Sequence, residues 1–282
     1  MKLFAPAKVN LYLRITGQRA DGYHLLVSLM VPISLGDDLI LSRVEGKPGS
    51  LALRTDDSDV PLGEENTVHR AVRVFRERTD EWAPVAVEIR KRIPMGAGLG
   101  GGSTNAVAVL RGMNELFGAG LSNQELVALA VSVGADVPFF ILGEAARVQG
   151  IGEQLSPVGA LPRLWMVVLF PNFPISTAWA YRNFRFKLTN SSNNNTLIGN
   201  LDTPHEVAQV MFNDLETVII NHYPHIAGLK AHLKESGAIG SLMSGSGSCV
   251  FGLFPDERDA KRSFAGFRGE KDIRAYLAFS LT

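Results

Sequence analysis

The chain has 282 residues, of which 46% are hydrophobic and 20% charged, a composition that excludes disorder along its whole length. Lys and Arg together number 28, and Asp and Glu also number 28, so no excess of positive charge supports nonspecific binding to nucleic acid. A local anion site is still possible, because backbone N–H groups can form one without net charge.

The sequence also indicates the cellular compartment in which the protein is expected to work. The single cysteine, Cys249, excludes an internal disulfide framework and a zinc site of several cysteines. The longest apolar run covers residues 164–170, whereas a membrane span needs about 20 residues. Pro6 and Lys8 interrupt the N-terminus before a signal sequence can form. We therefore expect a cytoplasmic protein with no membrane or nucleic-acid partner, and the oligomeric state stays open.

Hydrophobic periodicity predicts the elements of the first half. Alternation of polar and apolar residues predicts strands over residues 8–15 and 85–90, and short apolar segments with turn signals around them predict strands over residues 39–41 and 51–53. Helical spacing begins at Asn66 and again after a glycine-rich segment, residues 96–102. Ser122 is predicted to begin the next helix, with Glu125 completing a capping box.

The pattern resets after residue 155. A buried strand is predicted over residues 165–170 and a polar loop over residues 190–195. Helices are expected over residues 205–220, 226–234 and 256–267, a strand pair is expected around residues 245–248, and a short strand ends the chain. These elements predict two α+β halves joined near residues 150–160.

Five of the seven residues 96–102, here called the first glycine loop, are glycine. Each glycine costs about 0.5–1 kcal/mol relative to alanine in ordered structure, so the cluster needs a reason. A backbone that closely approaches a phosphate, with a helix N-terminus behind it, supplies that reason. The alternative, a mobile linker, fits poorly because no polar spacer separates the loop from its strand and helix. We expect Gly101 to adopt a positive φ.

Common nucleotide motifs do not explain this loop. Residues 96–101 match the G-x-G-x-x-G dinucleotide fingerprint, but that motif needs a following strand with an acidic end, and here a helix follows a helix. Ser103 stands where a P-loop would need lysine. The protein-kinase motifs are also absent.

The loop carries a resemblance to a known superfamily. Residues 94–106, Pro-Met-Gly-Ala-Gly-Leu-Gly-Gly-Gly-Ser-Thr-Asn-Ala, resemble the phosphate loop of the small-molecule kinases that include galactokinase, homoserine kinase and mevalonate kinase. Four further segments resemble the branch that acts on a cytidine diphosphate-linked methylerythritol: residues 6–11, 19–24, 134–140 and 243–248. The similarity extends from residue 6 to about residue 253.

The resemblance implies a two-domain α+β small-molecule kinase fold with the active site in the interdomain cleft. Residues 1–155 would form an N-terminal ATP-binding and catalytic domain, and residues 156–282 a C-terminal substrate-binding domain. The implied reaction is phosphorylation of the 2-hydroxyl of the methylerythritol moiety in the non-mevalonate isoprenoid pathway, with ATP as donor and Mg²⁺ expected. The alternatives are a homoserine or mevalonate type of kinase, a noncatalytic sensor of kinase ancestry and, on the weak fingerprint, a nicotinamide-dependent dehydrogenase.

The resemblance places the catalytic pair at Lys8 and Asp136. Asp136 stands among apolar residues and would accept the substrate hydroxyl proton, although a helix-end cap is the simpler interpretation of the residue alone. Lys8 would keep Asp136 ionised and stabilise charge on the transferred phosphoryl group, although by itself it suits an exposed strand position.

Substrate contacts are implied at several positions. His24 would read the cytosine edge, Tyr23 would stack on one face of the base, and Tyr181, with Trp179 as its rival, would stack on the other. Asn10 would contact the substrate near its diphosphate or erythritol. Thr177 lies in the segment that contains Tyr181, and Gly245 and Ser246 lie in residues 245–248, the second glycine loop, whose alternative interpretation is a hairpin turn.

Nucleotide contacts are implied along the first glycine loop and its flanks. Asn66 would lie near adenine, although it also suits a helix N-cap, and Lys91 and Met95 would form other walls. Ser103 and Thr104 would contact phosphates or magnesium, whose protein ligands stay unknown. The nucleotide-binding set comprises Pro94, Met95, Gly96, Ala97, Gly98, Leu99, Gly100, Gly101, Gly102, Ser103, Thr104, Asn66 and Lys91. Cys249, between small and apolar residues, is predicted to be a buried hydrophobe.

Overall fold

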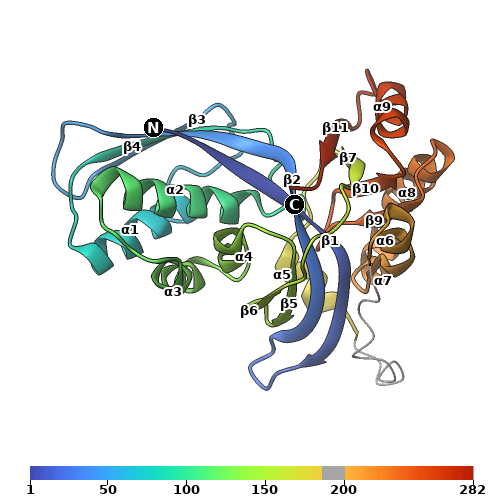
Figure 1. Ribbon diagram of the computed structural model, residues 1–282, viewed down its shortest axis with the longest axis horizontal. Coiled ribbons are helices and arrows are strands. Elements are labelled where there is room, and N and C mark those ends of the chain that lie inside the picture. The colour runs from blue at the N-terminus through green and yellow to red at the C-terminus, as the bar shows by residue number, and fades with distance from the viewer. Residues whose placement is uncertain (186–200, 282) are drawn as a thin grey trace. The chain divides into compact units, whose positions relative to one another are not determined.

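The structure is a computed structural model that describes residues 1–185 and 201–281. The chain forms two compact units, each built from several stretches of sequence (Figure 1). Unit 1 comprises Met1–Ala7, Gly36–Met95 and Gly100–Gly143, and unit 2 comprises Lys8–Leu35, Gly96–Leu99 and Glu144–Thr282. This grouping is spatial, and the functional boundary expected between residues 155 and 156 stays a prediction.

Two long strands contribute residues to both units. They are β1 (Lys2–Gln18), which contains the alternating segment predicted over residues 8–15, and β2 (His24–Arg43), which contains the strand predicted over residues 39–41. Beyond β2 in unit 1, the sheet order continues through β4 (Val85–Arg90) to β3 (Leu51–Thr55). Strand β4 runs antiparallel to β2, with Leu39 opposite Ile89, and parallel to β3.

Four of the described helices complete unit 1. They are α1 (Thr67–Thr79), α2 (Gly101–Phe117), α3 (Asn123–Val133) and α4 (Val137–Leu142). Helices α1 and α2 lie along one side of the strands (Figure 1), and α2 approaches them closely at Gly112. A Cβ at Gly112 would lie 2.7 Å from Leu3 Cδ1 and 2.9 Å from Leu41 Cδ2, so a larger residue at this position would require these leucine side chains to shift. The expected capping box of Ser122 and Glu125 is confirmed at the start of α3.

Unit 2 contains the remaining described strands. Strand β5 (Ala146–Gly150) pairs antiparallel with β2 and with β6 (Gln154–Pro157), and β8 (Phe212–Asn213) pairs parallel with β1 at Tyr12 and Leu13. A separate antiparallel sheet has the order β11 (Arg274–Phe279), β7 (Trp165–Phe170), β10 (Val250–Phe254), β9 (Gly240–Met243).

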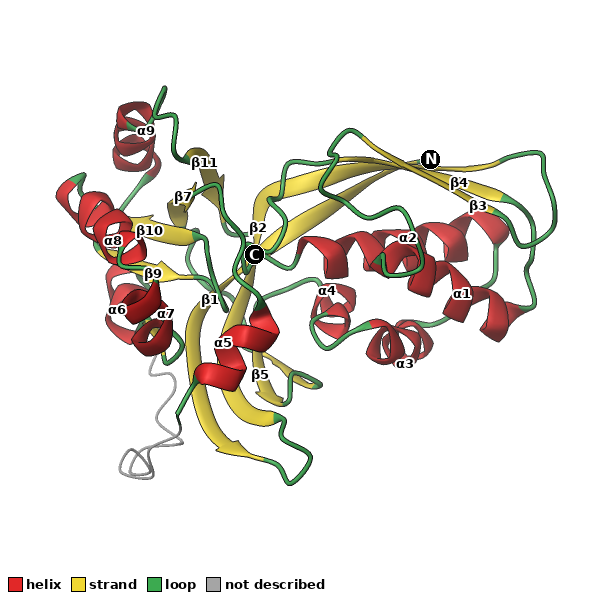
Figure 2. Ribbon diagram, turned by 180° about the vertical axis from the view of Figure 1, so that it is seen from behind, coloured by secondary structure: helices red, strands yellow, loops and turns green. Residues whose placement is uncertain are grey.

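Five helices belong to unit 2 among the described residues: α5 (Thr177–Asn183), α6 (Pro204–Val210), α7 (Glu216–His222), α8 (His225–Glu235) and α9 (Glu257–Gly266). Helix α8 packs against β9 and β10, and α9 packs against β7, β10 and β11 (Figure 2). The apolar core between them includes Val167, Leu233, Val250 and Phe254.

One expected helix is wrong. The predicted helix over residues 205–220 is interrupted, because α6 ends at Val210 and β8 precedes α7. Asn213 Oδ1 accepts from Leu215 N, and Asp214 Oδ2 accepts from Ile15 N, so these side chains bind backbone groups outside a helix. The strand over residues 165–170, the two later helices, the strand pair around residues 245–248 and the final strand are confirmed. The polar loop expected at residues 190–195 lies outside the described residues.

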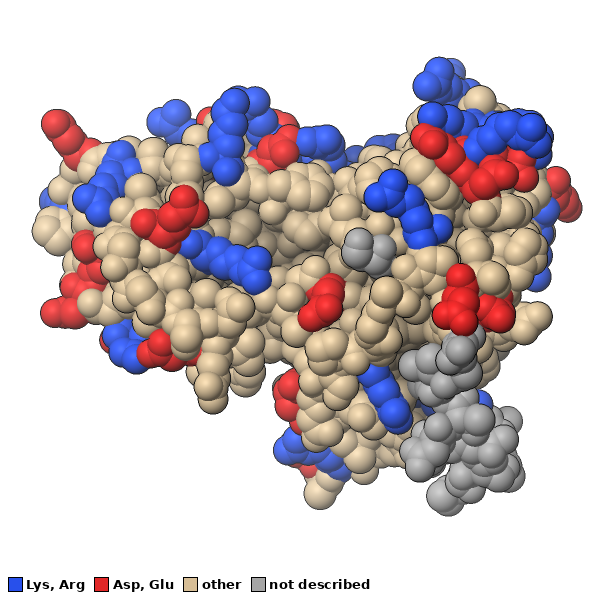
Figure 3. Space-filling model, in the orientation of Figure 1, with Lys and Arg blue, Asp and Glu red and all other residues tan. Residues whose placement is uncertain are grey.

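The distribution of charged side chains on the described surface agrees with the equal numbers of acidic and basic residues in the sequence. Acidic and basic side chains are interspersed on the face drawn in Figure 3, with no extended field of one sign among the described residues seen there. No helix within residues 1–185 and 201–281 has the length and apolar character needed to cross a bilayer.

Candidate active site

A buried polar chain begins at Lys8 in unit 2. Because side chains alternate along a strand, Lys8 and Asn10 share one face of β1, where they are 3% and 0% exposed. Lys8 Nζ donates to Asn10 Oδ1 at 2.5 Å, and Asn10 Nδ2 donates to Ser28 Oγ at 2.8 Å. Ser28 Oγ in turn donates to the Tyr12 carbonyl at 2.6 Å. A buried cation and amide are tolerated here because hydrogen bonds replace their water.

The part of the first glycine loop that belongs to unit 2, residues 96–99, contacts both this polar chain and the residue before the second glycine loop. Ser244 Oγ donates to Gly98 O at 3.0 Å and accepts from Asn10 N at 3.4 Å, while Lys8 N donates to Leu99 O at 3.0 Å. Gly98 has a φ of +76°, and a Cβ there would lie 2.0 Å from Ser244 O. Glycine at position 98 is therefore required for this contact.

The second glycine loop lies directly beside the lysine. Gly245 has a φ of +55°, and a Cβ on it would lie 3.2 Å from both Lys8 Nζ and Asn10 Oδ1. Ser246 Oγ lies 2.8 Å from Thr177 Oγ1, so these two predicted substrate residues are brought together in unit 2. The hairpin interpretation is confirmed, since β9 and β10 pair antiparallel on either side of the loop, and the substrate contacts of this loop stay a prediction.

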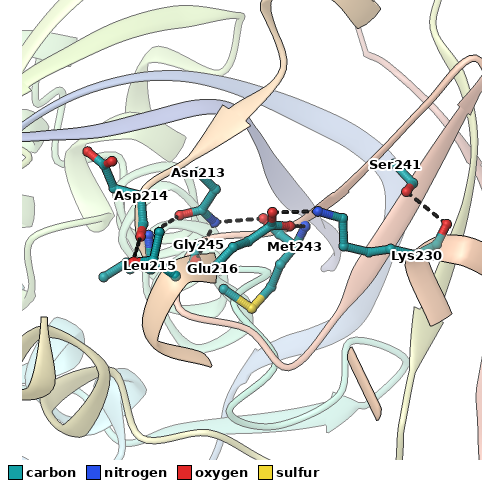
Figure 4. A network of polar contacts seen from close by, with 9 residues as sticks. Asn213, Asp214, Leu215, Glu216, Lys230, Ser241, Met243 and Gly245 are labelled. Carbon is teal, nitrogen blue, oxygen red and sulfur yellow. Dashed lines mark hydrogen bonds and ion pairs between the residues drawn. The ribbon is translucent and has the colours of Figure 1, made fainter. Parts of the chain in front are cut away.

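A group of residues that no sequence motif indicates holds this second loop in place (Figure 4). Asn213, 3% exposed, uses Nδ2 to donate to the carbonyls of Met243 and Gly245, each at 2.8 Å. Glu216 Oε1 accepts from Met243 N at 2.8 Å, and its Oε2 pairs with Lys230 Nζ at 2.5 Å. The polar run at residues 213–216 was the available signal, but it was assigned to a helix.

Two aromatic rings of unit 2, Tyr181 and Phe184, lie beside the histidine expected to read the base. His24 lies 5.6 Å from the Tyr181 ring centroid and 6.2 Å from that of Phe184, while Tyr23 is 62% exposed. Burial lowers the pKa of His24, so its neutral form is favoured. Trp179 instead packs edge-on against His222 and Tyr223, an arrangement that favours Tyr181 over Trp179 as the second stacking residue.

The remaining residues of the first glycine loop belong to unit 1, where Gly100 precedes α2 with a φ of +73°. The expected positive φ at Gly101 is wrong, because the positive values fall on Gly96, Gly98 and Gly100. Gly101 is restricted by space instead, since a Cβ there would lie 3.0 Å from Ile93 Cγ2. Thr104 is 2% exposed, and Ser103 precedes it in the first turn of α2.

Lys91 forms a buried ion pair in unit 1. Its Nζ donates to Asp37 Oδ2 at 2.5 Å, and the Lys91 and Asp37 side chains are 4% and 0% exposed. Asp37 Oδ1 also accepts from the backbone N–H groups of Arg92 and Ile93, each at 2.8 Å. Sequence reasoning missed Asp37, which is 54 residues from Lys91 and has no local motif.

Asn66 and Asp136 both occupy helix N-cap positions, but only the Asn66 side chain makes a capping hydrogen bond. Asn66 is confirmed as the N-cap of α1, where Oδ1 accepts from Val68 N and Nδ2 donates to Pro61 O, while its adenine contact stays a prediction. Asp136 occupies the N-cap position of α4 but makes no side-chain cap hydrogen bond. Asp136 thus takes the cap position that the simpler interpretation expects, without a capping hydrogen bond, and its role as the base stays a prediction. Cys249 is buried as expected, and burial strongly raises the pKa of its thiol.

Comparisons with known proteins agree with this geometry. Residues 66–144 match the GHMP kinases N terminal domain, and residues 197–268 match the GHMP kinases C terminal family. The first match covers α1 through α4 together with the first glycine loop, and the second covers the elements that hold the second glycine loop. The fold and its first glycine loop therefore define the class of ATP-dependent small-molecule kinases called GHMP kinases.

Individual relatives narrow the class. A 4-diphosphocytidyl-2-C-methyl-D-erythritol kinase from Syntrophotalea carbinolica is 41% identical over 272 residues, 96% of each chain. A crystal structure of a 4-(cytidine 5'-diphospho)-2C-methyl-D-erythritol kinase superposes with a TM-score of 0.81 at 35% identity, covering 100% of both chains. A Methanococcus jannaschii mevalonate kinase gives a TM-score of 0.74 at 14% identity over 100% of this chain and 98% of its own, which shows a shared fold alone. The chain belongs to the family of 4-diphosphocytidyl-2-C-methyl-D-erythritol kinases.

Proposed function

We propose that this protein transfers the γ-phosphoryl group of ATP to the 2-hydroxyl of 4-diphosphocytidyl-2-C-methyl-D-erythritol, in the non-mevalonate route to isoprenoid precursors. The observation that carries the proposal is the 41% identity to a kinase of that name over 96% of this chain. We also propose that the enzyme works in the cytoplasm, where ATP is available.

The aromatic group of unit 2 would bind the cytosine base. Tyr23 is exposed and can stack on a planar ring, and Tyr181 supplies a second face near His24. A neutral imidazole, favoured by the lowered pKa of His24, has one donor and one acceptor nitrogen, which suits hydrogen bonding to a base edge. The diphosphate or the erythritol would contact Asn10, Thr177, Gly245 and Ser246.

The chemistry is assigned to Asp136 and Lys8. As the 2-hydroxyl oxygen attacks the γ-phosphorus, Asp136 accepts the hydroxyl proton, and the bond to the leaving oxygen of ADP breaks. The Lys8 ammonium, which Asn10 holds at 2.5 Å, balances negative charge on the transferring group. A buried cation is effective here because little water screens it.

ATP phosphates would bind along the first glycine loop and at the N-terminus of α2, with Ser103 and Thr104 in the first turn. Asn66, Lys91 and Met95 are proposed for the adenine side. The ammonium of Lys91 already pairs with Asp37, so we expect Lys91 to contribute its aliphatic chain.

The described residues also fit a magnesium ion carried by the nucleotide. Within residues 1–185 and 201–281, no group of three or more His, Cys, Asp or Glu side chains could enclose a metal. Mg²⁺ commonly keeps its waters and binds through substrate phosphates with few protein ligands. Asn105, next to Thr104, has a buried Oδ1 without a hydrogen-bond partner in the described structure, and this oxygen is the first candidate ligand. When bound, the ion would neutralise phosphate charge.

The alternative activities are less well supported. Homoserine and mevalonate carry no base, so such a kinase would leave the Tyr23, His24 and Tyr181 group without a role. A nicotinamide-dependent dehydrogenase needs a strand after the helix that follows the fingerprint, whereas α2 is followed by α3 and α4.

The test is transfer of labelled phosphate from γ-labelled ATP to the cytidine substrate, with homoserine and mevalonate as competing acceptors. We expect label only on the cytidine compound, and a uridine analogue should be a poor acceptor because it exchanges a donor for an acceptor. Tyr23→Ala should raise the KM for the cytidine substrate while leaving the KM for ATP unchanged. Equal use of cytidine and uridine substrates would refute base recognition, and phosphorylation of homoserine or mevalonate instead would refute the function.

A further inference from the structure

Ser28 is a buried residue that neither the motifs nor the proposed chemistry uses. It lies on β2 with 0% exposure, between β1 residues Tyr12 and Asn10. Its hydroxyl has one proton, and the Tyr12 carbonyl, 2.6 Å away, can only accept a hydrogen bond. The Ser28 hydroxyl therefore donates to Tyr12.

This direction fixes the next contact. With its proton given to Tyr12, Ser28 Oγ can only accept from Asn10, so the Asn10 Nδ2 group faces Ser28 at 2.8 Å. The other end of the amide, Oδ1, then faces Lys8 Nζ at 2.5 Å. An amide rotated by 180° would place N–H groups against an ammonium at one end and a carbonyl oxygen against a hydroxyl oxygen at the other.

The backbone of Asn10 is also held, because Asn10 N donates to Ser244 Oγ at 3.4 Å. The side chain itself is held by Ser28 on β2 and by Lys8 on β1, so the amide cannot rotate without breaking both of these hydrogen bonds. At the end of the Asn10 amide that points away from Lys8, Ser28 is the residue that accepts from the Nδ2 group and so fixes the orientation of the amide.

We propose that Ser28 is a positioning residue for phosphoryl transfer, whose hydroxyl orients the Asn10 amide so that Oδ1 holds the Lys8 ammonium. The inference rests on the proposed function in assigning Lys8 to the transition state. Ser28 does not contact substrate in this scheme, and its effect passes through Asn10.

The kinetic test compares Ser28→Ala, Ser28→Thr and the control Ser263→Ala. Ser263 is also a buried serine of unit 2, 4% exposed and hydrogen-bonded to Ser236 on another element. Ser28→Ala should lower kcat by about 3- to 10-fold, the factor for one neutral hydrogen bond, without changing the KM for ATP. Ser28→Thr keeps the hydroxyl and should restore kcat, and Ser263→Ala should leave it unchanged. If the threonine variant does not fold, Ser28→Cys, with similar volume and a weak donor, should give an intermediate kcat.

A double-mutant cycle separates positioning from general destabilisation. In an Asn10→Ala background, Ser28→Ala should cause no further loss of kcat, since the group through which Ser28 acts is gone. If Ser28→Ala lowers kcat by the same factor with and without Asn10→Ala, the proposal is overturned. A Ser28→Ala enzyme with wild-type kcat would overturn it as well.

An independent readout does not need turnover. In protein labelled with ¹⁵N-asparagine, the Asn10 side-chain amide can be assigned by its loss in Asn10→Ala. Ser28→Ala should shift this signal and speed its hydrogen exchange, whereas Ser263→Ala should not. An unchanged signal would overturn the inference whatever the activity. Absence of kinase activity in the wild type would overturn the proposed function, while the amide signal would still decide the role of Ser28.

Discussion

Asp37 offers a sharp test of how unit 1 holds the wall beside the first glycine loop. Its side chain is fully buried and accepts three hydrogen bonds, from Lys91 Nζ at 2.5 Å and from the backbone N–H groups of Arg92 and Ile93 at 2.8 Å. Asp37→Ala would leave a buried ammonium and two N–H groups without these partners. The adjacent Asp38 pairs with Arg92, but these side chains are 47% and 55% exposed.

Substitutions at Asp37 and Asp38 should change the free energy of unfolding by very different amounts. Removing one partner of a buried ion pair costs about 3–5 kcal/mol, because the remaining charge stays desolvated. Removing one partner of an exposed pair costs about 0–1 kcal/mol, because water and salt already screen it. Asp38→Ala is therefore a matched control, one residue away on the same strand.

Urea unfolding followed by circular dichroism measures both effects. Asp37→Ala should lower the midpoint by about 1–2 M relative to Asp38→Ala, given the usual dependence of unfolding free energy on urea. Asp37→Asn, which keeps an acceptor for the N–H groups, should lie between them. A Cβ at Gly101 would lie only 3.3 Å from Lys91 Nζ, so folded Asp37→Ala should also show a raised KM for ATP. Equal midpoints for the two alanine variants would refute the reasoning.

Four further outcomes test the site. Gly98→Ala should abolish most activity because its Cβ would meet Ser244 O at 2.0 Å, whereas Gly228→Ala, whose Cβ would have no described atom within 4 Å, should retain activity in the same assay. Asp136→Asn should nearly abolish kcat while ATP binding measured by calorimetry stays within a few-fold, and a variant with half of wild-type kcat would remove Asp136 from the mechanism. Burial lowers the pKa of His24 in the folded state, so the unfolded chain binds more protons than the folded chain. The contribution of His24 to stability is therefore present above its unfolded pKa and is lost as the pH falls below it. His24→Gln should flatten this pH dependence in unfolding scans, and an unchanged slope would contradict the assignment. Cys249 should resist thiol labelling in the native protein and react on unfolding, since it is fully buried with a raised pKa, and rapid native labelling would contradict that burial.

The features that could be predicted from the sequence are those that depend on residues close together along the chain. Alternation located β1 and β4, and the Ser122 and Glu125 spacing located the start of α3, because strands and caps depend on neighbours within a few residues. The first glycine loop was likewise visible, since a glycine cluster between a strand and a helix has few structural explanations. Its individual backbone angles were not, and positive φ fell on Gly100 rather than Gly101.

Residues whose roles depend on distant partners were missed. Asp37 and Lys91 are 54 residues apart, and no pattern around Asp37 reveals that it is buried. Asn213 and Glu216 were assigned to a continuous helix because spacing alone favours one there. Pairing of β8 with β1 and hydrogen bonds to the second loop region outweigh that local preference.

The polar face of β1 shows how burial changes the interpretation of a sequence pattern. Periodicity assigns Lys8, Asn10 and Arg14 to one face, which would ordinarily be interpreted as exposed to solvent. The face is half-buried at Arg14, but Lys8 and Asn10 are 3% and 0% exposed, where Gly98, Ser244 and Gly245 pack over them. Once covered, a lysine and an amide must find partners within the protein, and Ser28 supplies the last of these contacts. A cation held at fixed geometry and shielded from water stabilises developing negative charge more strongly than an exposed one, so the covering that hides these residues from sequence reasoning supports the proposed role of Lys8 in phosphoryl transfer.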